Sequence, residues 1–168
     1  ETIRSIKRNI NGLNKISNER IFNELSKILK LKNLYSLFLN KSSREIILNI
    51  FPQFKYYERL KINNTLNDRT RNKYDECLIL ALLLIDKSND YEYFCHKYRV
   101  SNNTKMRLKN IFKNYQNFDD KNFYLEENFK KIIYQTSKNE ALDLLLFSKC
   151  LKNINIDKFI NYVNICEV

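Results

Sequence analysis

Glycine and proline are almost missing from this chain, and their scarcity constrains its fold more than any other feature. The 168 residues contain one glycine, Gly12, and one proline, Pro52. β-Sheets need many tight turns, and those turns favour Gly, Pro, Asn and Asp. Asn is abundant here, but a single Gly argues strongly against β-sandwiches and β-barrels. It also excludes glycine-rich phosphate-binding loops, because neither GxGxxG nor a Walker loop can be written with one Gly.

Apolar residues recur at helical spacing along almost the whole chain. Ile21, Leu25 and Ile28 follow Ser17, a favoured N-cap, at the i, i+4, i+7 pattern. Capping signals also precede three later runs: Ser42 with Glu45, Ser101, and Ser137 with Glu140. Residues 68–87 are interpreted as a buried helix, and Pro52 should stop the helix before it. We therefore predict an all-α, multi-helix fold without a sheet, with a core that includes Leu80, Leu83, Leu84, Leu108, Ile111, Phe112, Leu144 and Leu145.

Basic residues are in excess, and they are unevenly distributed. The chain has 30 Lys and Arg against 19 Asp and Glu, a net charge of +11. Residues 1–73 carry 16 basic and 6 acidic groups, and residues 99–118 carry 5 basic groups and no acidic one. An AT-rich genome would also raise the lysine content, but codon bias should spread the charge evenly. The concentration predicts a basic surface for a phosphate-rich partner such as nucleic acid.

Cysteine usage and hydropathy favour a cytoplasmic location. The four cysteines lack CxxC spacing and there is one histidine, so a zinc site is not expected. Cys77 and Cys150 stand in apolar runs, where a free Cys behaves as a small hydrophobic residue. The longest apolar run, residues 77–85, is far shorter than the roughly 20 residues of a membrane span. We predict no membrane association, no signal peptide and a reducing, cytoplasmic compartment.

No set of residues forms a complete active site. His96 is adjacent to Cys95, and adjacent helical residues diverge by about 100°, so the two cannot form a nucleophile–base pair. His96 is interpreted as a partly buried structural residue. Asp90 and Glu92 resemble a spaced carboxylate pair for Mg²⁺, but their segment is helical, which separates the two side chains. We predict no catalytic residue, no metal ligand and no cofactor in this chain.

A row of lysines is the strongest candidate for nucleic-acid binding. Lys105, Lys109 and Lys113 lie at i, i+4, i+8 beside the apolar face of one helix. Their mutual repulsion would become attraction beside a phosphate backbone, although an ordinary solvated helix face is equally compatible with the pattern. Possible extensions of this candidate site are Arg99, Arg107, Arg69 and Arg71.

One aromatic segment offers a second type of nucleic-acid contact. Tyr56, Tyr57 and Arg59 interleave rings with a charge, which could allow stacking on bases. In a helical protein, core packing is the favoured interpretation of such residues.

The N-terminal segment carries a distinctive set of residues at fixed spacing. They are Thr2, Ile6, Ile16, Ser17, Glu19, Arg20, Ile21, Glu24, Leu25, Lys27 and Leu29. The segment resembles the neck of bacterial class II CCA-adding tRNA nucleotidyltransferases and their poly(A) polymerase relatives, in which a "T…AI" helix is followed by "IS.ERI..EL.K.L" at the same spacing. Weaker similarity continues through residues 80–84, 100–108 and 139–146. The loop 40–43 lacks the family's Gly, and Thr104 replaces an acidic residue.

The resemblance implies a neck (1–31), a body (32–118) and a tail (119–168). Ser17, Glu19, Arg20 and Glu24 would form the neck motif that supports the nucleotide pocket, and Arg20 and Glu24 could pair at i, i+4. The family's catalytic motifs would precede Glu1, so Mg²⁺ with CTP and ATP belongs to a head domain outside this chain. That head could be part of the same parent chain or a separate subunit.

The expected function is tRNA binding for an enzyme that adds CMP and AMP to the tRNA 3′ end. Two alternatives stay open: a poly(A) polymerase branch, and a helical protein-interaction module whose charge reflects codon bias.

Overall fold

The computed structural model describes residues 2–65, 72–119, 125–151, 161–162 and 164–165, and these contain helices and no strand. This confirms the all-α prediction. The 3-10 segments are η1 (Ile10–Lys15), η2 (Tyr57–Thr65) and η3 (Tyr115–Asp119). The α-helices are α1 (Thr2–Asn9), α2 (Asn18–Leu29), α3 (Leu34–Leu39), α4 (Lys41–Ile50), α6 (Glu76–Leu84), α7 (Asp90–Lys97), α8 (Asn102–Asn114), α9 (Glu126–Gln135) and α10 (Lys138–Leu151). None of the helices in the described part is long and apolar enough to cross a membrane.

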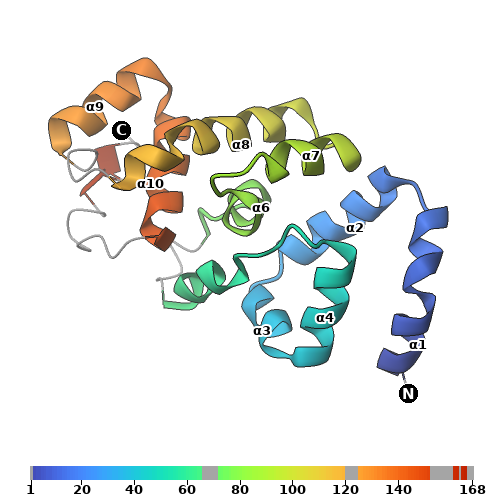
Figure 1. The fold of residues 1–168 in the computed structure, drawn as a ribbon. Coiled ribbons are helices and arrows are strands. Elements are labelled where there is room, and N and C mark those ends of the chain that lie inside the picture. Colours follow the sequence, from blue (N-terminus) through green and yellow to red (C-terminus); the bar gives the residue numbers. More distant parts are fainter. Residues whose placement is uncertain (1, 66–71, 120–124, 152–160, 163, 166–168) are drawn as a thin grey trace.

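Helix α6 lies at the centre of the molecule (Figure 1). Its residues from Cys77 to Leu84 are all buried, because α2, η2, α8 and α10 pack around it. A helix that is apolar on every side must be enclosed in this way. The prediction of a helix over 68–87 was too long: α6 begins at Glu76, because the Asp75 side chain accepts a hydrogen bond from the Leu78 N–H at 2.9 Å.

Three of the four predicted capping residues are confirmed, and one is wrong. Ser17, Ser101 and Ser137 each accept a hydrogen bond from the backbone N–H three residues later. Helix α4, however, is capped by Asn40, which accepts from the Ser43 N–H at 3.0 Å, so Ser42 lies inside the helix. Helix α4 ends before Pro52, as predicted.

The predicted core is confirmed except at one position. Seven of its eight residues are buried, whereas Phe112 is half-buried and packs its ring 4.8 Å from that of Tyr91. The N-terminal segment joins this core through Leu25 and Leu29 of α2, and through Phe22, whose ring lies 6.3 Å from that of Phe94.

The described cysteines behave as core residues. Cys77, Cys95 and Cys150 are all buried and unpaired by disulfides. Burial raises the pKa of Cys77 to about 12 and those of Cys95 and Cys150 to about 11. These thiols therefore stay protonated at neutral pH, which confirms the structural interpretation of Cys77 and Cys150.

Candidate RNA-binding surface

Helix α8 presents the predicted lysine row to solvent. Leu108 and Ile111, both fully buried, fix one face of the helix against the core. Lys105, Lys109 and Lys113 are all exposed, and within the described residues none of them forms an ion pair with a carboxylate. A helix rises about 6 Å over four residues, so the three ammonium groups form a row roughly 12 Å long.

Arg99 and Arg107 were grouped with this row, but the structure pairs both with carboxylates. Arg99 is exposed, and its Nη1 lies 2.8 Å from Glu19 Oε1 in α2. Arg107 is mostly buried and binds Asp75 and Asp143, with nitrogen–oxygen distances of 2.6 and 2.7 Å. Arg107 is therefore removed from the candidate RNA contacts, because all three of its guanidinium nitrogens already donate to these carboxylates.

The remaining predicted extension, Arg69 with Arg71, lies outside the described residues. The helix they were expected to begin starts only at Glu76. Lys73, two residues after Arg71 in the sequence, is half-buried in the turn before that helix.

The neck motif performs local structural roles that its spacing only partly predicted. Ser17 caps α2, and Glu19 forms the ion pair with Arg99. Glu24 accepts a hydrogen bond from Lys27 Nζ at 2.7 Å instead of pairing with Arg20. Arg20 is exposed and has no ionic partner in the described part of the chain. It lines a groove of about 710 Å³ that also borders apolar side chains of η1, α2 and α4.

Besides the lysine row of α8, an exposed pair of arginines lies in α1, and it was not predicted from the sequence as a binding site. Arg4 and Arg8 are four residues apart, so both project from one side of this helix, and both are exposed. Helix α1 stands at the edge of the molecule (Figure 1). The i, i+4 spacing of the two arginines is the sequence signal for this pair.

The aromatic segment after Pro52 belongs to the core, as the favoured interpretation predicted. The Tyr57 ring stacks on Phe38 with centroids 5.0 Å apart. Arg59 lies over the Tyr56 ring at 4.1 Å and donates to the Ile85 carbonyl at 2.6 Å. Burial lowers the pKa of Arg59, yet the guanidinium stays charged and completes the C-terminal end of α6.

The residues considered for catalysis are separated. Cys95 is buried and His96 is exposed, so the two do diverge, but the prediction that His96 is partly buried was wrong. Asp90 accepts a hydrogen bond from Lys55 Nζ at 2.6 Å, and Glu92 accepts one from the Tyr91 hydroxyl at 3.1 Å. In the described ranges, no three His, Cys, Asp or Glu residues gather where they could hold a metal ion.

A comparison with protein families gives a match over residues 1–57. The matching family is described as the "Probable RNA and SrmB- binding site of polymerase A". The N-terminal third of this chain is similar to the RNA-binding region of polymerase A. The match contains both α1 and α2, and it confirms the resemblance predicted from the neck residues. No curated protein and no solved structure gave a significant match.

Proposed function

We propose that this chain is the RNA-binding helical portion of a nucleotidyltransferase of the polymerase A and CCA-adding type, and that its RNA is tRNA. The observation that carries the proposal is the match of residues 1–57 to an RNA-binding region. The same residues contain 11 basic and 4 acidic groups, so the matched segment is strongly positive. Positive surfaces of this kind bind the phosphate backbone whatever the sequence, which suits a protein that must accept many tRNAs.

Packing places the matched segment and the lysine row of α8 on one core. Helix α2 packs against α6, and α6 packs against α8. Two ion pairs also connect this segment to the rest of the fold. Glu19 of α2 pairs with Arg99 in the loop between α7 and α8, and Lys30 at the end of α2 pairs with Glu76 of α6. In the proposed complex, Arg4 and Arg8 of the matched segment contact the RNA, and the lysine row of α8 contacts it as well.

Nucleotide addition requires a further unit. A catalytic head, in the same parent chain or in a separate subunit, would hold Mg²⁺ with CTP or ATP and supply the transfer chemistry. The role of the residues described here is to bind and position the RNA. The isolated chain should therefore incorporate no labelled CMP or AMP into tRNA, with or without Mg²⁺.

Salt dependence of tRNA binding tests the proposal. Three triple variants are compared with the unmodified chain by fluorescence anisotropy between 50 and 200 mM salt: Lys105, Lys109 and Lys113 to Gln; Arg4, Arg8 and Arg20 to Gln; and Lys41, Lys61 and Lys87 to Gln as a control. All nine side chains are exposed and have no ionic partner in the described residues, so net charge changes equally. Gln has nearly the helix propensity of Lys and Arg, so folding should survive.

We expect the slope of log affinity against log salt to become shallower by about 2–3 in each of the first two variants and to change little in the control. Equal losses in all three would mean that only net charge matters and would refute the localised surface. Binding by the unmodified chain that does not weaken with salt would favour the protein-interaction alternative. Tighter binding of oligo(A) than of tRNA would place the chain in the poly(A) polymerase branch.

A further inference from the structure

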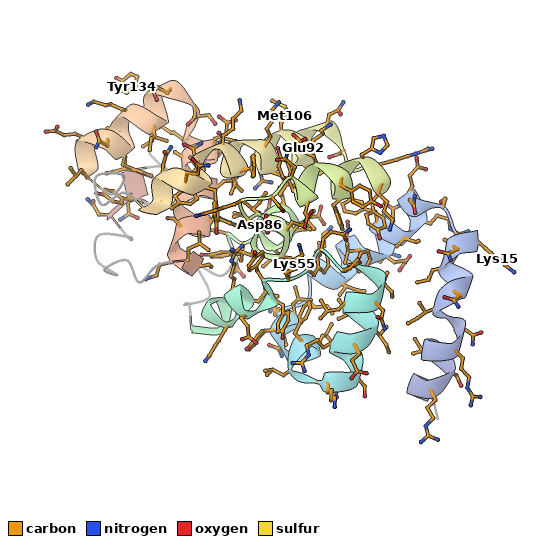
Figure 2. The ribbon with its side chains drawn as sticks, viewed as in Figure 1. Lys15, Lys55, Asp86, Glu92, Met106 and Tyr134 are labelled. Carbon is orange, nitrogen blue, oxygen red and sulfur yellow. The ribbon has the colours of Figure 1, made fainter. Side chains whose placement is uncertain are left out.

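Tyr134 is the most exposed large hydrophobic side chain among the described residues. It is 93% exposed, although it lies in the last turn of α9. The rest of this helix packs normally: Phe129 is buried, and Ile132 and Ile133 are half-buried against the core. Tyr134 points away from the molecule (Figure 2) and makes no hydrogen bond or ring contact with the other described residues. Fold stability therefore does not explain an aromatic residue at this position.

The charges around Tyr134 are mostly basic. Lys131 precedes it by three residues, so its stem lies on the same side of α9, and Lys138 begins the next helix three residues after α9 ends. Both lysines are exposed and have no ionic partner in the described residues. The nearest exposed acid on this side of α9, Glu127, lies two turns away at the other end of the helix. Glu140, in the first turn of α10, interacts with Ser137.

A second exposed tyrosine gives the contrast. Tyr93 of α7 is 58% exposed, and the charges near it in sequence are mixed: Glu92 precedes it directly, Asp90 is paired with Lys55, and Lys97 follows four residues later. Of these two tyrosines, Tyr134 therefore has the more positive surroundings.

We propose that Tyr134 stacks on an unpaired base of bound RNA, while Lys131 and Lys138 contact the adjoining phosphates. An aromatic ring beside basic residues is the usual arrangement for single-stranded nucleic acid, because every base offers a π-face and every linkage offers a charge. Met106 of α8 and Tyr134 lie at the same edge of the molecule in Figure 2, so the stacked base would extend the surface formed by the α8 lysines. This inference rests on the proposed function and names a contact within it.

The test separates stacking from charge. Tyr134→Leu removes the ring, Tyr134→Phe keeps it, and Tyr93→Leu is the matched control. The probe is a single-stranded RNA oligonucleotide that carries 2-aminopurine, whose fluorescence reports stacking, and Kd is measured with the full chain at several salt concentrations. Because Tyr134 is almost fully exposed, none of its variants should alter the melting temperature.

We expect Tyr134→Leu to weaken binding about 10-fold at every salt concentration, with an unchanged salt slope and a reduced 2-aminopurine signal. Tyr134→Phe and Tyr93→Leu should stay within about 2-fold of the unmodified chain. Unchanged affinity for Tyr134→Leu would overturn the stacking contact, while salt-dependent binding by the unmodified chain would leave the proposed function intact. Loss of self-association in Tyr134→Leu without loss of RNA affinity would assign the ring to a protein contact and would also overturn the inference. Failure of the unmodified chain to bind RNA would refute the proposed function itself.

Discussion

Arg107 connects three helices, and its replacement gives the sharpest test of how this fold is stabilised. The side chain leaves α8 and donates two hydrogen bonds to Asp143 of α10, at 2.7 and 2.8 Å. It donates two more to Asp75, at 2.6 and 3.2 Å, and Asp75 in turn caps the central helix α6. Asp143 is buried, with 6% of its surface exposed, whereas Asp75 remains open to water.

The predicted perturbation is Arg107→Met, which keeps the apolar stem and the helix propensity but removes the charge. The buried Asp143 carboxylate then has no cation, and loss of one partner from a buried pair costs about 3–5 kcal/mol. For a chain of this length, such a loss lowers Tm by roughly 6–20 °C. Lys109→Met in the same helix is the control, because an exposed substitution should change stability by less than about 0.5 kcal/mol.

The pH dependence of the Arg107→Met variant gives a second signature. Burial already raises the pKa of Asp143, and the hydrogen bonds from Arg107 oppose that rise. Without Arg107 the folded-state pKa rises further above the unfolded value, so protonation favours the folded state. The loss of Tm in Arg107→Met relative to the unmodified chain should therefore become smaller as the pH falls from 7 towards the ordinary Asp pKa near 4. Arg107→Met combined with Asp143→Leu should recover most of the stability at pH 7, because no charge is left unpaired.

Two results would contradict this reasoning. Equal small shifts in Tm for Arg107→Met and Lys109→Met would show that the network contributes nothing to stability. The loss of stability in Arg107→Met could instead persist unchanged at low pH and not be reduced by Asp143→Leu. That result would show that the lost packing of the arginine stem, and not the unpaired Asp143 carboxylate, destabilises the variant.

Three further predictions follow from the packing. Replacement of Arg59 by Leu should destabilise the fold by about 2–3 kcal/mol in denaturant unfolding, because two carbonyls at the end of α6 lose a charged donor. Arg99→Gln should cost less than about 1 kcal/mol in the same assay, since its ion pair is exposed. Cys77, Cys95 and Cys150 should resist a thiol reagent in the folded protein and react after unfolding, as peptide mapping would show; rapid labelling of the native chain would contradict their burial and raised pKa values.

Most of the helical architecture could be predicted because its signals are local. A serine three residues before the N–H that it binds marks a helix start in the sequence itself, and apolar spacing marks the buried face. The failure at α4 shows the limit of such signals. Asn40 both ends α3, where its N–H donates to the Ser36 carbonyl at 3.3 Å, and begins α4 by capping Ser43. Asn and Ser are equally good caps, so local preference could not choose between Asn40 and Ser42.

The candidate surface was harder to predict, because exposure depends on the whole fold. The α8 lysines could be placed from their relation to Leu108 and Ile111 in the same helix. The exposure of Tyr134 could not be predicted in this way. It directly follows Ile132 and Ile133, which are apolar, so the sequence pattern would place all three residues on one buried face. Only the packing of α9 on α10 shows that the tyrosine lies outside that face.

Charge counts along the sequence overestimate the number of basic groups around α8 that are available to bind RNA phosphates. Residues 99–118 contain five basic groups and no acid, yet two of the five meet carboxylates from distant segments. Glu19 pairs with Arg99 across 80 residues of sequence, and Asp143 pairs with Arg107 across 36. Three lysines without an ionic partner among the described residues remain, so this helix can neutralise about three phosphates and contribute a salt slope of about 2–3, not the larger value that five free charges would give. A loss of slope near 4 or 5 when Arg99→Gln and Arg107→Met are added to the lysine variant would mean that RNA displaces these carboxylates from the two arginines. Arg107→Met alone would then weaken RNA binding as well as stability.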